Sequence, residues 1–536
     1  MKDIMIVKPD KCVGCKACLR SCPAPEANSI KKMQGDKEIV NINSSKCIAC
    51  GECIKACPHN ARDYIDDTDA FMARLSEEKM IVIADPAIRT AFPNKWKDIL
   101  NWFKKKGCLI FDGALGADIY VWALLKAIET HKSEKTISQS CAALSAYIKM
   151  YQPELVKKLA PIYSPSVCLS IYIKNNLRRN NKIAVLSPCA AKKIEYTDVG
   201  YVDFNVTFKK LMEYFDKNDI VVPSVTYDDI DYEFEDKQGQ MGTVISRLGG
   251  LCDGILFSGS DIAVESSSGV FKVYPELKLY AKMPAVTLPN VFDAISCEYG
   301  CNMGPGSTAS QTPFDIAASM RRTELSIKDK FSKGKGALRT GDGKLFKKFD
   351  DELRLEDFMI KSTKNPKAYI LPKPDEINAA FKSMNKNTKA ERTYNCGACG
   401  FKTCDDLAIA VCRKLASPDA CVRQFGSYSS KALSLNESKL LLENINIITD
   451  NIDAISKTNS KIAVKMGSVK ELLKKMALFC EKNTSIDENS VKQLLCVLET
   501  TVKSFEIFDE STGKLKEETS LVEESVHKMA ELLEKK

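Results

Sequence analysis

The fold of this chain is decided by three stretches of its sequence: Ser138-Gln139-Ser140-Cys141, Ser187-Pro188-Cys189-Ala190-Ala191-Lys192-Lys193-Ile194-Glu195 and Cys297-Glu298-Tyr299-Gly300-Cys301. None has the spacing of a zinc knuckle, because no second cysteine lies two residues from Cys141 or Cys189 and no histidine is nearby. Four cysteines from three separate loops can still bind one cubane iron–sulfur cluster, whose irons each accept one thiolate. Glycines at positions 300, 304 and 306 would let the backbone bend closely around such a cluster.

These stretches resemble the motifs of a known family, the FeFe (iron-only) hydrogenases. Residues 187–195 are similar to the family's second motif, Met-Pro-Cys-Thr-Ala-Lys-Lys-x-Glu, and residues 138–143 to its first, Thr-Ser-Cys-Cys-Pro-Gly. Cys297-x3-Cys301, with the glycines that follow, resembles the third motif. The order and rough separation of the motifs also match, and the likeness covers roughly residues 1 to 425. Each motif alone would be weak, but together they are specific.

Length and composition indicate a chain of several domains. The 536 residues are 44% hydrophobic and 28% charged, as is ordinary for a soluble protein, and the net charge of +8 is too dispersed to indicate nucleic-acid binding. No apolar run reaches transmembrane length and the first residues lack a signal-peptide core, so we expect a cytoplasmic protein without a membrane span. With 22 cysteines and only three histidines, we expect sulfur ligands to metal rather than a secreted disulfide scaffold.

The first 65 residues have the spacing of a two-cluster ferredoxin domain. The pattern Cys-x2-Cys-x2-Cys-x3-Cys-Pro occurs twice, and in such ferredoxins the fourth cysteine of each run binds the other cluster. We therefore expect two 4Fe-4S clusters that relay electrons, with a pair of zinc sites as the alternative. The predicted ligands are Cys12, Cys15, Cys18 and Cys57 for one cluster, and Cys47, Cys50, Cys53 and Cys22 for the other.

The fold class that we predict is multidomain α/β, with residues 78–390 as the central domain. Within it, short apolar runs alternate with helical patterns, which is typical of parallel strands joined by helices. Such folds bind ligands beyond the carboxyl ends of the strands, where Cys189 is expected to lie. The predicted strands are Ile81–Ala84, Ile183–Leu186 and Ile255–Phe257, and the predicted helices are Ala117–Thr130 and Ala142–Tyr151.

Residues 391–425 contain a further cysteine group, spaced Cys396-x2-Cys399-x4-Cys404-x16-Cys421. This spacing resembles the small single-cluster domain of iron–sulfur electron carriers and predicts one more 4Fe-4S cluster. Zinc sites built from four cysteines are common, so zinc is the alternative here.

Residues 426–536 are predicted to form a helical coiled-coil tail. Eleven positions alternate steps of four and three, and only Asn459 among them is polar. A single asparagine in such a repeat commonly fixes register and strand number, so we expect a homodimer and a signalling role; a helical bundle within one chain is the alternative. The positions are Leu441, Ile445, Ile448, Ile452, Ile455, Asn459, Ile462, Met466, Val469, Leu473 and Met476.

The resemblance implies a specific cofactor, the H-cluster. In the family, three cysteines bind a 4Fe-4S cluster, and a fourth bridges it to a diiron unit that carries CO, cyanide and an azadithiolate. By motif position, Cys141, Cys189 and Cys297 would be the terminal ligands and Cys301 the bridging one. Lys192 would donate a charge-assisted hydrogen bond to a cyanide. Pro86 and Ala87, in a stretch similar to the family's Ala-Pro-(Ala/Ser)-x-Arg loop, would contact the cofactor.

By this resemblance the protein would split H2 into protons and electrons, and would exchange electrons with a carrier such as ferredoxin. Its departures from the family concern the proton route. Ser140 replaces the proton-transfer cysteine, and a serine hydroxyl does not readily ionise near neutral pH. Leu124 and Ala127 replace two relay glutamates and Ala160 a relay serine, while Ser187 and Ile295 replace methionines near the diiron unit.

We therefore expect slow turnover, and the added cluster domain and tail are similar to the family's sensory branch. Two alternatives stay open: an ordinary ferredoxin-linked hydrogenase with another proton path, and a hydrogenase-related cluster carrier or assembly protein without the diiron unit. A third, weaker alternative is a structural zinc scaffold with a coiled coil.

Overall fold

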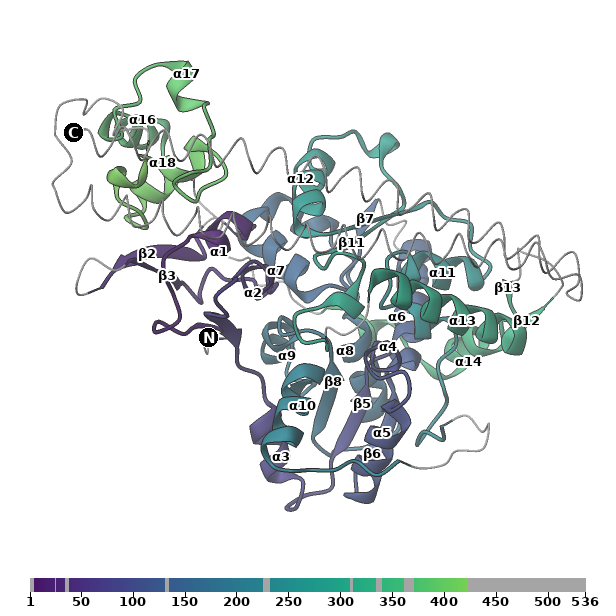
Figure 1. Ribbon diagram of the computed structural model, residues 1–536. Coiled ribbons are helices and arrows are strands. Elements are labelled where there is room, and N and C mark those ends of the chain that lie inside the picture. The colour runs from purple at the N-terminus through teal and green to yellow at the C-terminus, as the bar shows by residue number, and fades with distance from the viewer. Residues whose placement is uncertain are drawn as a thin grey trace, which may run out of the picture. The chain divides into compact units, whose positions relative to one another are not determined.

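The structure is a computed structural model that describes residues 4–422, except 25, 34–37, 131–134, 225–231, 309–311, 334–339 and 361–370 (Figure 1). The described residues belong to one unit of the chain, Met1–Phe425. The predicted coiled-coil tail and its homodimer fall on residues 426–536, outside the described part. Among the described helices, none is both long enough and apolar enough to cross a bilayer.

The N-terminal region consists of two antiparallel strand pairs and two short helices that start inside the cysteine runs. Helix α1 (Ala17–Ser21) begins after Lys16, and α2 (Glu52–Lys55) begins after Gly51. Both residues that precede a helix have left-handed backbone, which turns the chain sharply at each cysteine run. The strand pairs are β1 (Met5–Val7) with β4 (Arg62–Tyr64), and β2 (Asn28–Lys32) with β3 (Glu38–Ile42).

The central region contains a four-stranded parallel sheet covered by helices on both faces (Figure 1). Alternate side chains of a strand point to opposite faces. Accordingly, Ile81 and Ile83 pack with helices α6 and α8, whereas Val82 and Ala84 pack with α3, α5 and α10. In spatial order the strands are β6 (Leu109–Asp112), β5 (Ile81–Ala84), β8 (Ile183–Ser187) and β9 (Phe204–Thr207). The helices are α3 (Thr68–Arg74), α5 (Trp96–Lys105), α6 (Gly113–Thr130), α8 (Pro165–Ile171) and α10 (Phe208–Lys217).

A second, three-stranded parallel sheet supplies the other site loops. Phe292 and Ala294 pack against helices α7 (Ala142–Tyr151) and α12 (Val270–Tyr280), while Val291 belongs to the cluster around α6. Asp293 therefore lies on the face of the sheet turned toward α6. The strands, in spatial order, are β10 (Val264–Ser268), β11 (Val291–Ile295) and β7 (Thr136–Ile137).

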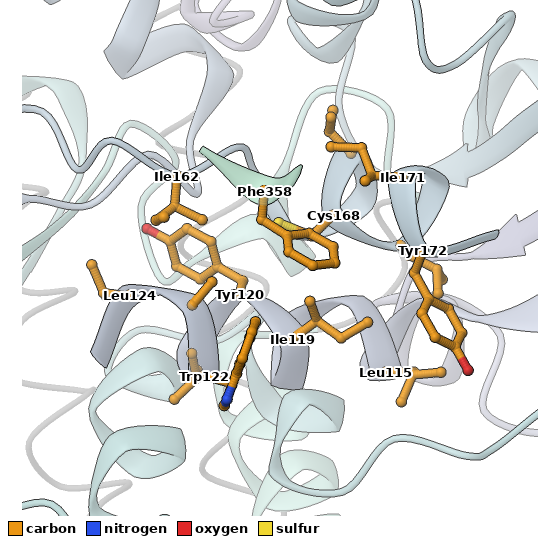
Figure 2. Close-up of a cluster of buried hydrophobic side chains, with 14 of the residues drawn as sticks. Leu115, Ile119, Tyr120, Trp122, Leu124, Ile162, Cys168, Ile171, Tyr172 and Phe358 are labelled. Carbon is orange, nitrogen blue, oxygen red and sulfur yellow. The ribbon is translucent and has the colours of Figure 1, made fainter. Parts of the chain in front are cut away.

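Helix α6 is the centre of the largest buried cluster. Figure 2 shows side chains of α6, among them Tyr120, Trp122 and Leu124, packed with residues of α8 and with Phe358. A side chain at Gly116 would lie 2.4 Å from the carbonyl oxygen of Pro165, so this glycine permits the close approach of α6 to α8. Trp122 donates a hydrogen bond to Asp350 of α14 (Lys344–Glu352) at 2.8 Å.

The last described helices surround the third cysteine group. Helix α16 (Pro374–Ser383) packs against α18 (Cys404–Cys412), whose first turn is closed by a capping box between Thr403 and Asp406. This region also contacts the N-terminal region, because the amide of Ile30 donates to the carbonyl of Leu415 at 3.0 Å.

One predicted strand is wrong. Ile255–Phe257 lies in helix α11 (Gly250–Phe257), which packs against α6. A short apolar run fits a buried helix as well as a buried strand, and periodicity alone does not separate them. The other predicted strands and helices are confirmed, with α6 starting earlier than expected, at Gly113.

Candidate iron–sulfur centre

Four cysteines of the central region lie in loops that follow parallel strands. Cys189 follows β8, Cys141 follows β7 and Cys297 follows β11, while Cys301 begins the short helix η5 (Cys301–Met303). Parallel strands place their carboxyl ends at one edge of a sheet, so each sheet presents its cysteine loops on one side. The amide of Cys301 donates to the carbonyl of Ser246 at 2.7 Å, which fixes the last loop.

The four thiols are close enough to affect one another. Burial raises the pKa of Cys189 to about 11, and the neighbouring Cys141 adds to the shift. Burial also raises the pKa of Cys297 and Cys301, again helped by the other cysteines of the group. Four buried thiolates repel each other unless a positive centre compensates them, and the irons of a cluster supply that charge. The donor set therefore fits an iron–sulfur cluster.

No three His, Cys, Asp or Glu side chains of the described residues converge tightly enough to hold a single metal ion. A cubane requires a different arrangement, with one thiolate near each of its four irons.

A buried pocket lies beside Cys301. Its lining includes Pro86, Ser140, Lys192 and Ile295, which the sequence predicted for the site, but not Ala87 or Ser187, which are both fully buried. Lys192 lies in this lining, is only 7% exposed, and donates to Ser166 Oγ at 3.1 Å. The lining includes Pro86, Ser140, Ser166, Lys192, Ile295 and Cys301.

Lys192 remains a cation in spite of its burial. Burial by itself would lower its pKa, but Tyr196, Glu195 and Asp85 around it raise the pKa above that of a free lysine. Burial raises the pKa of Asp85, and the charge of Lys192 opposes this shift. The pocket thus presents a fixed ammonium group next to a cluster cysteine, which suits a bound anion.

The N-terminal cysteines divide into two groups. Cys18 interacts with Cys57 and Cys12, while Cys22 interacts with Cys47. Cys50 and Cys53 interact with Cys22 and Cys47, but Cys53 also interacts with Cys18 of the other group, so the crossed pairing expected from the sequence stays a prediction. Cys15 is exposed.

In the third cysteine group, Cys399 interacts with Cys421 and Cys396. The buried Lys386 donates to Cys404 Sγ at 3.4 Å.

Several residues at these sites were not predicted from the sequence. Arg62 is buried and donates to Cys18 Sγ at 3.0 Å and to the carbonyl of Val40 at 2.7 Å. The Oγ of Ser296 lies 3.5 Å from Cys141 Sγ and shares a hydrogen bond of 2.8 Å with the hydroxyl of Tyr274. Such contacts depend on tertiary structure, and no local pattern in the sequence marks them.

The positions at which the resemblance places proton-relay residues carry buried apolar side chains in this protein. Leu124, Ala127 and Ala160 are all fully buried in the cluster around α6, and Figure 2 shows Leu124 in it. No titratable side chain occupies these three positions.

Comparison with protein families agrees with this arrangement. Residues 78–274 match the family described as iron only hydrogenase large subunit, C-terminal domain. Residues 78–274 of this chain are therefore FeFe-hydrogenase-like. Residues 4–58 match a 4Fe-4S dicluster domain, and residues 393–423 match an Fe-S cluster domain, so the chain carries iron–sulfur domains on both sides of its hydrogenase-like domain. No curated protein sequence matches the chain.

Two solved structures show what the hydrogenase-like chain is similar to. An apo FeFe-hydrogenase HydA1 variant from Chlamydomonas reinhardtii is 14% identical, with a TM-score of 0.40, and the match covers 54% of this chain and 94% of that one. An FeFe-hydrogenase structure that concerns oxygen inactivation of the H cluster is also 14% identical, with a TM-score of 0.41 and the same coverage.

Proposed function

We propose that the central site holds an H-cluster and that the protein binds H2 and splits it reversibly and slowly. The observation that carries this proposal is the pocket in which Cys301, Lys192 and Ser140 meet, beside the three other cysteine loops. Cys141, Cys189 and Cys297 would bind the 4Fe-4S part, and Cys301 would bridge it to the diiron unit. When bound, the diiron unit supplies the H2-splitting chemistry; the protein supplies orientation, hydrogen bonds and exits for protons and electrons.

Three side-chain roles follow from the pocket. The ammonium group of Lys192 would donate to a cyanide of the diiron unit, which orients that unit and balances its negative charge. Pro86 would contribute to the apolar wall of the pocket, with the buried Ala87 directly after it in sequence. Ser140 would stand where the pocket opens toward the proton route.

We further propose a sensory or regulatory role instead of bulk hydrogen metabolism. Support comes from the apolar residues at the usual relay positions, which predict slow proton exchange. The electrons would pass to the N-terminal and C-terminal clusters, and from them to a carrier such as ferredoxin or to a signalling partner at the tail. Hydrogen evolution as fast as in vigorous catalytic hydrogenases would overturn the sensory role.

Infrared spectroscopy of protein matured with the diiron unit tests the main proposal. We expect bands from metal-bound CO and cyanide that shift under H2. Cys301→Ala should lose these bands, whereas Cys108→Ala, which removes a buried thiol outside the site, should keep them. If the wild-type protein contains cubanes but shows no such bands, a cluster-carrier function replaces the hydrogenase proposal.

A further inference from the structure

A chain of hydrogen bonds leads away from the pocket at Ser140. Ser140 Oγ lies 3.4 Å from Ser138 Oγ, and Ser138 Oγ donates to Asp293 Oδ1 at 2.9 Å. A serine hydroxyl has one proton to donate, and Ser138 directs its proton to Asp293. Ser140 can donate its single proton to Ser138 Oγ or to the carboxylate of Asp293, so both hydroxyls connect the pocket with Asp293.

Asp293, at the end of this chain, is a buried carboxyl group that can bind a proton. It is 1% exposed, and its Oδ2 has no hydrogen-bond partner among the described residues. Burial raises the pKa of Asp293 to about 6, although hydrogen bonds from Ser138 and Ser140 oppose the shift. A group with a pKa in this range can both accept and release protons near neutral pH.

The groups that face Asp293 do not hold it permanently ionised. Tyr120 of α6 and Cys252 of α11 are the titratable side chains whose charged forms interact with it within the described part of the chain, and neither is a cation. The third element packed on Asp293 is the loop after β7, which contributes the two serine hydroxyls.

Partly exposed polar groups lie near Asp293. Cys252 is only half-buried, and it interacts both with Asp293 and with the exposed Glu265 of β10. Asp293 itself is paired with Ser266 of the same edge strand. Asp293 thus neighbours both a serine that lines the pocket and groups that are partly exposed.

We propose that Ser140, Ser138 and Asp293 form the proton route of this protein, with Asp293 as the relay carboxyl group. This inference rests on the proposed function of the pocket. It replaces the route through positions 124, 127 and 160, which are apolar here.

The transfer conserves protons and moves no electrons. A proton that reaches Ser140 Oγ from the pocket is balanced by transfer of the hydroxyl proton of Ser140 to Ser138, and that of Ser138 to Asp293. The carboxyl group then releases its proton toward the surface, and both hydroxyls rotate back. The contact of 3.4 Å between the serines is long for a hydrogen bond between hydroxyls, so it must shorten during transfer.

The first test uses the full chain with its iron–sulfur clusters but without the diiron unit. An infrared pH titration should show a carboxylic acid band that disappears as the pH rises, with a midpoint near the pKa of Asp293, about 6. This band should be absent in Asp293→Asn. Ser138→Ala should move the midpoint upward, because it removes a hydrogen bond that stabilises the carboxylate. Ser145→Ala is the matched control, since it removes a buried hydroxyl of α7 that has no hydrogen-bond partner in the described structure. A midpoint that Ser138→Ala leaves unchanged would contradict the chain of contacts.

The second test uses protein loaded with the diiron unit and follows exchange between H2 and deuterated water. Asp293→Asn, Ser138→Ala and Ser140→Ala should each slow exchange by about a hundredfold, while Asp293→Glu should restore most of the rate and Ser145→Ala should not change it. If Asp293→Asn does not fold, the two serine variants still provide the test. If the variants keep the CO and cyanide bands and exchange at the wild-type rate, the relay is overturned but the proposed function of the pocket is not. Missing bands in the wild-type protein would overturn the proposed function and the relay with it.

Discussion

At the scale of single residues, the site combines a buried cation with three cysteines, Cys189, Cys297 and Cys301, whose pKa burial raises. Lys192 is held by Ser166 and by the carboxyl groups near it, so its ammonium group has a fixed position. A fixed charge costs no reorganisation when an anionic ligand binds. This explains why a lysine, which is normally exposed, lies inside the pocket.

Lys192→Met should weaken retention of the diiron unit. The variant keeps most of the side-chain volume but removes the hydrogen-bond donor, so we expect the CO and cyanide bands to fall by at least about tenfold. Iron and sulfide content should stay unchanged, because the cysteines remain. Lys193→Met is the control, since Lys193 pairs with Asp67 at 2.8 Å and does not line the pocket. Bands of equal strength in the two variants would contradict the assigned role of Lys192.

Arg62 is the corresponding buried cation of the N-terminal region. Burial raises the pKa of Cys18, and Arg62, bonded to its sulfur, opposes the shift. A hydrogen bond from a cation stabilises the reduced, more negative state of a cluster. Arg62→Gln should therefore lower the reduction potential of the cluster at Cys18, on the order of 50–100 mV for a lost interaction of about 1.5–2 kcal/mol.

A redox titration followed by electron paramagnetic resonance measures this shift. Arg20→Gln serves as the control, because Arg20 is exposed on α1 and makes no contact with a cluster cysteine in the described structure. A change of the same size in both variants would show that net charge alone, and not the Arg62–Cys18 contact, sets the potential.

At the scale of secondary-structure elements, the close approach of α6 to the segment before α11 depends on glycine. A side chain at Gly242 would lie 2.1 Å from the carbonyl oxygen of Ala114, and the amide of Gly242 donates to Asp118 of α6 at 2.7 Å. Gly242→Ala should destabilise the protein by about 1–3 kcal/mol through overpacking, measured as a lower midpoint of thermal or denaturant unfolding. Gly254→Ala should cost less, since its nearest neighbour is a movable side-chain atom of Val121 at 3.1 Å.

Elements built on local patterns could be predicted, whereas contacts between distant elements could not. The cysteine spacing and the strands at Ile81 and Ile183 follow from residues adjacent in sequence. Ile255–Phe257 was misassigned because its apolar run is too short to show a period. The approach of Ser138 to Asp293 depends on the pairing of β7 with β11, two strands more than 150 positions apart in sequence. No local feature of the chain encodes that register.

At the scale of the whole described molecule, the cysteine groups follow one another in space. Lys55 and Glu52 of the N-terminal region act on Cys297 of the central site, and a side chain at Gly51 would collide with Pro305. On the other side, Cys18 and Leu19 share a buried cluster with Phe401 and Leu407 of the third cysteine region. The N-terminal region thus contacts both other cysteine regions, which would allow electrons to pass from the proposed hydrogen site to the proposed third cluster.

This order predicts that the ion pair between the N-terminal and third cysteine regions controls electron transfer between them. Arg413 Nε lies 2.9 Å from Glu26 Oε1, although the pair lacks the alignment of a hydrogen bond. Arg413→Glu would place two carboxylates together and weaken the contact between the two regions. Each 1.4 kcal/mol of contact free energy that is lost would lower the ratio of molecules with the contact formed to those without it about tenfold. Under H2, freeze-quenched electron paramagnetic resonance should show slower reduction of the third cluster, with unchanged CO and cyanide bands at the hydrogen site. The charge-swapped double variant, Glu26→Arg with Arg413→Glu, should restore the rate, because it rebuilds the pair with opposite polarity. Fast reduction of the third cluster in the single variant would mean that its electrons arrive by another route.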